Sequence, residues 1–118
     1  MTRQEQSGKR DLTVNNWIRN KLPDSSTGFM VSDLDFILYN YKTKKLMLLE
    51  IKQYGKQIPT WQRNLFNILH HALQIGLASD IEYLGFHLVR FEKQDFSGKI
   101  YLDNQEVTEQ ELIDKLSF

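Results

Sequence analysis

The stretch that decides the fold is Ser32-Asp33-Leu34-Asp35-Phe36-Ile37-Leu38-Tyr39, which a lysine-rich turn separates from Leu46-Met47-Leu48-Leu49-Glu50-Ile51-Lys52. Both runs are largely apolar and of strand length, and the polar reversal between them predicts a β-hairpin. Charged side chains are rarely buried without a partner. The carboxylates and the amine inside these runs therefore have no packing reason to be there, and such breaks of a local pattern tend to mark functional sites.

The geometry of this hairpin brings ionisable groups together. Directly opposed residues of an antiparallel pair share a face, and their numbers have a constant sum. With the turn near residues 42–44, a sum of 85 sets Asp35 opposite Glu50, a sum of 87 sets it opposite Lys52, and a sum of 86 turns it to the other face. Alternate residues of one strand share a face, so Asp33 accompanies Asp35, and Lys52 accompanies Glu50. Two of the three registers predict a cluster of three or four ionisable groups.

Length and composition predict one globular domain over residues 1–118, with a loose polar lead-in over 1–10. The chain has no cysteine, which excludes a disulfide framework and thiolate metal sites and suits the cytoplasm. No apolar run approaches the roughly 20 residues of a bilayer span, so no membrane association is expected. The net charge of zero conceals an asymmetry, because residues 1–63 carry +5 and residues 64–118 carry −5. A local basic cluster can still bind a polyanion.

Hydrophobic periodicity and turn signals predict an α+β fold. The expected elements are a helix over 11–22, one or two strands within 29–40, a strand over 46–52, a helix over 61–78, strands over 82–93 and 99–103, and a helix over 109–116. Pro23 ends the first helix, and Thr60 is a candidate N-cap for the second. Thr108 and Glu111 have the spacing of a capping box before the last helix.

Two carboxylates on neighbouring strands are typical of a site for a hard divalent cation. Mg²⁺ or Mn²⁺ takes oxygen ligands and is commonly held by one or two carboxylates together with water and substrate phosphate. Lys52 lies two residues beyond Glu50 on the same face, where it could offset developing negative charge or orient an attacking water. These are the components of metal-assisted phosphodiester hydrolysis.

The order Asp35, Glu50-Ile51-Lys52, with a helix before and an amphipathic helix after, resembles the PD-(D/E)XK nuclease superfamily over residues 11–92. The resemblance implies a restriction-endonuclease-like αβββαβ core, with a mixed sheet flanked by helices, to which this chain adds a C-terminal strand and helix. It also implies that Asp35, Glu50 and the backbone carbonyl of Ile51 bind the metal and that Lys52 acts on the nucleophilic water.

The pattern departs from the family in two respects. No proline precedes the aspartate, and Asp33 competes with Asp35 as the metal ligand. Members of the resolvase-like branch carry a glutamate in the first helix, for which Glu5 and Asp11 are imperfect candidates. Many members also present a polar residue from the helix after the hairpin, which here is Gln62 or Arg63.

Each of these features also has a simpler interpretation. Glu50 and Lys52 could form an exposed ion pair of little energetic value, and Asp33 could serve the backbone of a turn. Adjacent His70 and His71 face different directions on a helix, so they predict no metal site. The basic residues Lys42, Lys44, Lys45 and Lys56 are either solvated or bind backbone phosphates without reading sequence.

The sequence thus favours a small Mg²⁺-dependent DNA endonuclease that is structure-selective or weakly sequence-specific, in keeping with a phage or mobile element and with a homodimer. RNA is an open alternative as the substrate. The second hypothesis is a catalytically inactive nuclease-fold module that binds nucleic acid or protein. The third is an unrelated α+β interaction domain whose acidic C-terminal half contacts a partner.

Overall fold

The computed structural model describes residues 12–93 and 97–118, in two compact units that comprise residues 1–32 and 33–118. The predicted loose segment 1–10 and the acidic candidates Glu5 and Asp11 lie outside the described residues. The expectation of one domain over 1–118 stays a prediction.

The described part of the first unit contains the helix α1 (Leu12–Lys21), which matches the helix predicted over 11–22. Pro23 follows its end, as expected for a residue that lacks a backbone N–H. A short 3₁₀ turn (Ser25–Thr27) comes next, and it ends at Gly28, whose φ of 93° is one that glycine adopts without strain. The strand predicted within 29–40 begins only at Phe36, so residues 29–35, with both candidate aspartates, precede it.

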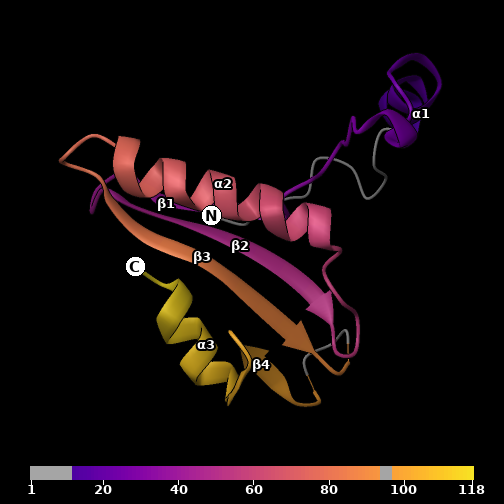
Figure 1. The fold of residues 1–118 in the computed structure, drawn as a ribbon. Coiled ribbons are helices and arrows are strands. Elements are labelled where there is room, and N and C mark those ends of the chain that lie inside the picture. Colours follow the sequence, from indigo (N-terminus) through magenta and orange to yellow (C-terminus); the bar gives the residue numbers. More distant parts are fainter. Residues whose placement is uncertain (1–11, 94–96) are drawn as a thin grey trace. The chain divides into compact units, whose positions relative to one another are not determined.

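The second unit is built around a mixed sheet that, over its described residues, has five strands in the order β1-β2-β3-β4-β5. These are β1 (Phe36–Asn40), β2 (Lys45–Gln53), β3 (Glu82–Phe91), β4 (Ile100–Leu102) and β5 (Gln105–Val107). The pair β2–β3 is parallel and is connected by the helix α2 (Thr60–Gly76), whereas the other pairs are antiparallel. Figure 1 shows β2 and β3 side by side along the length of α2.

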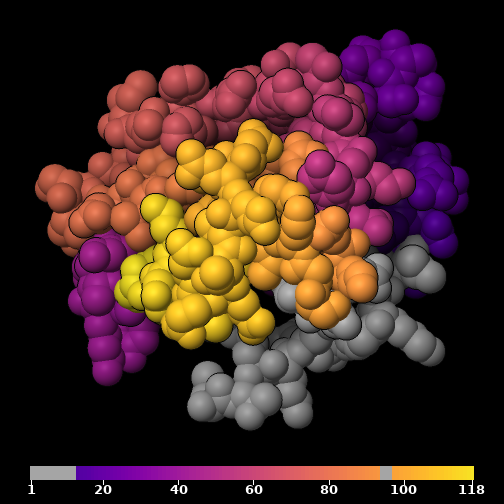
Figure 2. All heavy atoms as spheres, turned by 90° about the horizontal axis from the view of Figure 1, so that it is seen from below, coloured from indigo at the N-terminus to yellow at the C-terminus, as the bar shows by residue number. Residues whose placement is uncertain are grey.

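The two faces of the sheet are covered by different helices. On one face Phe66 of α2 packs on Phe86 of β3, with ring centroids 4.9 Å apart. On the other face Leu112 of α3 (Glu109–Leu116) joins a buried apolar cluster with Leu49, Val89 and Ile100. Figure 2 shows this second face with the yellow C-terminal segment spread over it. Consequently Met47, Leu48 and Leu49 in β2 are buried whichever face they point to.

A bulge in β3 determines which of its side chains face α2. Leu46 pairs with Tyr83 and Leu48 with Phe86, so β3 uses three residues where β2 uses two. Gly85 has a φ of 97° at this point, a conformation that only glycine takes easily. After the bulge Lys52 is paired with Arg90, and without the extra residue it would be paired with Val89.

His87 and Asp103 hold this bulge against the β4–β5 hairpin. The His87 ring contacts the carbonyl oxygen of Leu84 at 2.7 Å and an oxygen of Asp103 at 2.6 Å. The other oxygen of Asp103 accepts a hydrogen bond from the backbone N–H of Leu88. Asp103 and Asn104 both have positive φ, as a tight two-residue hairpin turn requires.

The α+β class and the mixed sheet are confirmed, but the strand count before α2 is not. An αβββαβ core needs three strands before its second helix, and the described residues provide two there. Strand β5 was not expected at all. Thr60 is the first helical residue of α2 rather than its N-cap, a position that Pro59 occupies. The capping box of Thr108 and Glu111 is confirmed by both of its hydrogen bonds. Among the described residues, no helix is long and apolar enough to cross a bilayer.

Substitution of Gly85 by alanine tests the bulge. We expect Gly85→Ala to lower the free energy of unfolding by about 1 to 2 kcal/mol, because an L-residue is strained at positive φ. Gly76→Ala is the matched control, since open space surrounds Gly76 at the end of α2; it should be neutral or stabilising by about 0.5 kcal/mol. Urea unfolding measures both, and equal effects would contradict the role assigned to the bulge.

Candidate functional site

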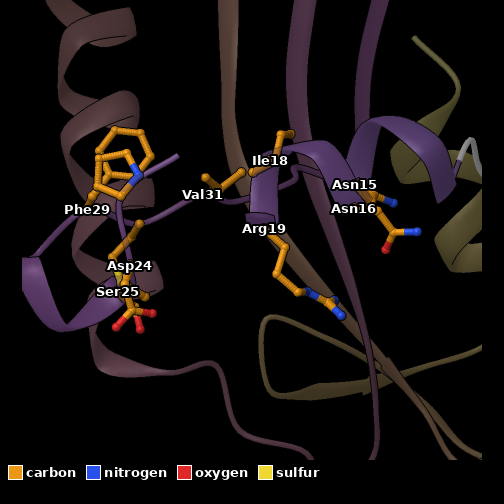
Figure 3. A pocket seen from close by; sticks show the side chains of 10 residues that line it. Asn15, Asn16, Ile18, Arg19, Asp24, Ser25, Phe29 and Val31 are labelled. Carbon is orange, nitrogen blue, oxygen red and sulfur yellow. The ribbon is translucent and has the colours of Figure 1, made fainter. Parts of the chain in front are cut away.

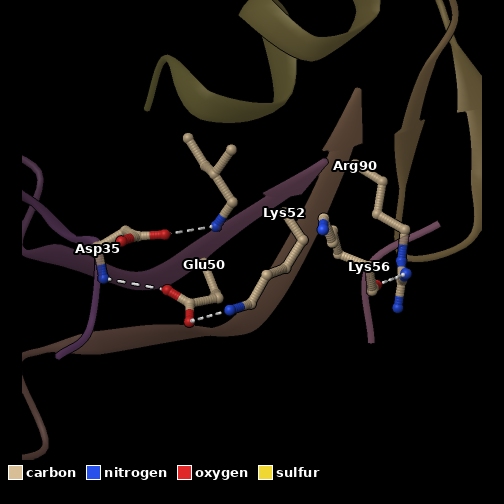
Figure 4. A network of polar contacts seen from close by, with 6 residues as sticks. Asp35, Glu50, Lys52, Lys56 and Arg90 are labelled. Carbon is tan, nitrogen blue, oxygen red and sulfur yellow. Dashed lines mark hydrogen bonds and ion pairs between the residues drawn. The ribbon is translucent and has the colours of Figure 1, made fainter. Parts of the chain in front are cut away.

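The β1–β2 hairpin adopts the register that brings Asp35 to Glu50. Its opposed pairs run from Phe36 with Leu49 to Asn40 with Lys45, and each pair of numbers sums to 85. Asp35 directly precedes β1 and is held by two reciprocal hydrogen bonds: its backbone N–H donates to Glu50 Oε1 (3.2 Å), and its Oδ2 accepts from the backbone N–H of Ile51 (2.9 Å). Figure 4 shows the Glu50 carboxylate directed toward the backbone nitrogen of Asp35, and the Asp35 carboxylate directed toward a backbone nitrogen of β2. Of the two aspartates, Asp35 is therefore the one whose carboxylate is fixed beside Glu50.

Glu50 is a buried acid in an unfavourable electrostatic position. It is 2% exposed and is the only charged residue among the buried residues that the structure describes. The pKa of Glu50 is raised from the usual 4.5 to about 7. Burial is the largest cause, the side-chain hydrogen bond and negative charge of Asp35 add to it, and the Asp35 backbone N–H and the Lys52 charge act in the opposite direction. A neighbouring cation would favour the ionised form of this pair. That is the electrostatic condition expected at a cation site.

Lys52 completes the predicted triad on the same face of the sheet. Its Nζ lies 4.0 Å from Glu50 Oε2, at the limit of an ion pair, and its side chain is 27% exposed. The ammonium group is therefore close enough to influence Glu50 and still reaches solvent (Figure 4). The structure brings together Asp35, Glu50 and Lys52 as predicted.

The donor set fits a divalent cation held by few protein ligands. Within the described residues, no group of three or more histidine, cysteine, aspartate or glutamate side chains is arranged to hold a metal ion. Two carboxylates with water and substrate phosphate suffice for Mg²⁺. Asp33 takes part in an interaction of its own, and its ligand role stays a prediction.

Arg90 lies next to Lys52 in the sheet, a position that was not expected from the sequence. It is the register partner of Lys52 on β3, and its Nη1 donates to the backbone carbonyl of Lys56 at 2.6 Å. Figure 4 shows Lys52, Lys56 and Arg90 on the side of the site away from Asp35. The sequence did contain a sign of this position. Phe86, Leu88 and Arg90 are alternate residues of the predicted strand, so Arg90 places a charge on a face that is otherwise apolar.

The remaining predicted nucleic-acid contacts divide into two groups. Gln62 and Arg63 lie in the first turn of α2, which begins at the end of the sheet where β2 ends. The other group lies at the β1–β2 turn, at the opposite end of β2: Lys42, Lys44 and Lys45. From Lys45 to Glu50 the strand advances about 17 Å. These three lysines therefore lie away from the carboxylates, and their contacts with backbone phosphates stay a prediction.

The predicted site is distinct from two hollows of the structure. One of about 590 Å³ lies within the first unit, and Figure 3 shows Asn15, Asn16 and Arg19 of α1 among its lining. Another of about 500 Å³ lies between the end of α2 and the start of β3. Neither is lined by Asp35, Glu50 or Lys52.

His70 bonds to Tyr83 at 2.7 Å and so has a structural partner.

Comparisons with known proteins give no guide to the function. No family model matches the chain, and no significant match is found to a curated protein or to a solved structure.

The pH dependence of stability tests the environment of Glu50. Because its pKa is about 7 in the native chain and near 4.5 in the unfolded chain, its contribution to stability is present below pH 4.5 and is lost as the pH rises through 7. We expect Glu50→Gln, measured in EDTA by urea unfolding, to gain stability relative to the native chain by on the order of 2 to 3 kcal/mol over that range. Parallel pH curves for the two proteins would contradict the raised pKa.

Proposed function

We propose that this protein is a divalent-metal-dependent hydrolase of phosphodiester bonds in nucleic acid, with DNA as its substrate, of the PD-(D/E)XK nuclease kind. The observation that supports the proposal best is the reciprocal bonding of Asp35 with the Glu50-Ile51 segment, with Lys52 on the same face. Glu50 and Lys52 also lie in the carboxyl-terminal half of β2, which is parallel to β3, and open sheets commonly bind ligands toward the carboxyl ends of parallel strands.

In this proposal Asp35, Glu50 and the backbone carbonyl of Ile51 hold Mg²⁺ or Mn²⁺. The ion would supply Lewis acidity toward the phosphate and lower the pKa of a bound water. The hydrogen bond from Ile51 N–H fixes the orientation of the Asp35 carboxylate, and the hydrogen bond from Asp35 N–H fixes that of Glu50. The protein chain thus contributes preorganisation, which reduces the reorganisation needed during reaction.

Lys52 has the position of a residue that acts on the attacking water or on the developing charge. Its reach to Glu50 Oε2 keeps its ammonium group near the acid pair, and its partial exposure leaves it open to a substrate. A small chain offers little surface for reading bases, so the proposed cleavage is structure-selective or weakly sequence-specific.

A catalytically inactive nucleic-acid-binding module is the second candidate. It is favoured by the small number of acidic ligands, since the described residues place two carboxylates at the site where many metal centres use three. Such a module would bind without cutting.

Cleavage assays on supercoiled plasmid and on branched oligonucleotides test the hydrolase. We expect nicking with Mg²⁺ or Mn²⁺ and none with EDTA. Asp35→Asn, Glu50→Gln and Lys52→Ala should each reduce the rate on the order of 100-fold or more, because each removes a group in contact with the metal or the reacting atoms.

Asp114→Asn on α3 is the control for the loss of one carboxylate and should leave nicking unchanged, since α3 covers the other face of the sheet. Full activity in Glu50→Gln, or loss confined to Asp33→Asn, would refute the assignment of Asp35 and Glu50. Binding without nicking by the native protein would favour the second candidate.

Metal binding should also appear as stabilisation. We expect Mg²⁺ to raise the melting temperature of the native protein by several degrees, and more at pH 8 than at pH 6, because Glu50 must lose its proton to bind the ion. In Glu50→Gln the increase should disappear. Thermal unfolding followed by circular dichroism measures this without any substrate, and an equal increase in both proteins would indicate that the ion binds elsewhere.

A further inference from the structure

A strip of cationic and aromatic side chains crosses the sheet beside the acid pair. Lys52, Arg90 and Tyr101 are successive cross-strand partners on β2, β3 and β4, so they share the face on which Glu50 lies. The loop after β2 adds Lys56 and Tyr54. We refer to these five residues as the Arg90 strip.

Within the described residues, Arg90 is a cation without a counterion. In the described part of the chain no carboxylate forms an ion pair with it. Its Nη1 is held by the carbonyl of Lys56, and its Nε is buried without a hydrogen-bond partner. A positive group that is partly desolvated and uncompensated is unfavourable unless an anion approaches it. A planar guanidinium is well suited to the oxygens of a phosphate.

Tyr54 and Tyr101 supply an aromatic platform at the same place. Their rings stack with centroids 5.1 Å apart and planes inclined by 26°. Tyr54 is the outer ring, with 56% of its surface exposed. Stacking on an aromatic side chain requires a base whose face is free, which a paired base inside a duplex does not offer.

The positions of these groups match one strand of nucleic acid that passes the acid pair. Glu50 and Arg90 are separated by two residues along the strand and by one step across the sheet, or about 8 Å between their Cα atoms. This separation would allow neighbouring phosphates of one backbone to meet the carboxylates and Arg90. Tyr101, the cross-strand partner of Arg90, places the tyrosine pair one strand further along.

We propose that the Arg90 strip binds an unpaired segment of the nucleic acid, with a backbone phosphate on Arg90 and Lys56 and an unpaired base stacked on Tyr54. This inference rests on the proposed function for the nature of the ligand and specifies its substrate class: DNA with single-stranded nucleotides next to the cleaved bond, as in a flap, gap or branch.

Binding of fluorescent oligonucleotides in EDTA tests the strip without metal or cleavage. The native protein should bind a single strand more tightly than a duplex of the same sequence. Tyr54→Ala should weaken single-strand binding by about tenfold and leave duplex binding unchanged, because only an unpaired base can stack. Tyr54→Phe, which keeps the ring, should retain the affinity.

Arg90→Met should also weaken single-strand binding by about tenfold, and it should lower the slope of log affinity against log salt by about 0.7, as the loss of one phosphate contact requires. Arg90→Lys keeps the charge and should preserve the slope while it loses part of the affinity. Melting temperatures establish that each variant is folded.

Two matched controls lie away from the strip. Tyr41→Ala removes an exposed tyrosine, 69% accessible, at the far turn of the hairpin, and Lys115→Gln removes a cation from α3. Both should retain the native affinity and salt slope.

Three results would each overturn the proposal. Folded Tyr54→Ala and Arg90→Met could bind single strands as tightly as the native protein does, the control variants could lose as much affinity as these two, or the native protein could fail to bind single strands. Failure of the hydrolase is distinguishable, because a protein that never nicks DNA but loses single-strand affinity in both variants still supports the strip. Nicking with unaltered affinity in both variants refutes the strip alone.

Discussion

The reciprocal hydrogen bonds between Asp35 and the Glu50-Ile51 segment are the interaction on which the site depends. They extend the β1–β2 ladder by one residue and use side-chain oxygens in place of backbone carbonyls. The same two contacts that end the strand pairing also fix two carboxylates beside each other. Structure and chemistry therefore cannot be separated at this position, and a change that frees either acid also alters the end of the strand.

The hairpin shows how far a sequence can determine a site. The position of the turn limited the register of the β1–β2 hairpin to three values, and two of them bring the charged side chains to one face. The observed register, in which paired residue numbers sum to 85, is one of those two. The choice among them depends on the turn, where Lys44 adopts a positive φ and Asn40 caps the backbone of residues 42 and 43. That local geometry has no clear signature in composition, which is why the register could be bounded but not selected.

Arg90 and β5 were missed for different physical reasons. Alternation places Arg90 on one face with Phe86 and Leu88, but it does not tell that this face meets Lys52 across a parallel pair whose register is shifted by a bulge. The β4–β5 hairpin turns at Asp103-Asn104 without a glycine, using two residues that tolerate positive φ, so the usual turn signal was weak. By contrast, the capping box of α3 depends only on residues three apart, and sequence predicted it correctly. Local hydrogen bonds are encoded locally, whereas the meeting of β2 and β3 depends on contacts made across the sheet.

The bulge at Gly85 also limits which mutations this part of the chain can tolerate during evolution. Downstream of it, Val89 joins the apolar cluster beneath α3 while Arg90 lies on the opposite side with Lys52. Deletion of one residue from the bulge would reverse the faces of the residues after it. Arg90 would then point into the apolar cluster beneath α3, and Val89 would point toward the face that carries Glu50. A single in-frame deletion there is thus more damaging than most point substitutions, and this short segment should tolerate replacement of side chains better than any alteration of its length.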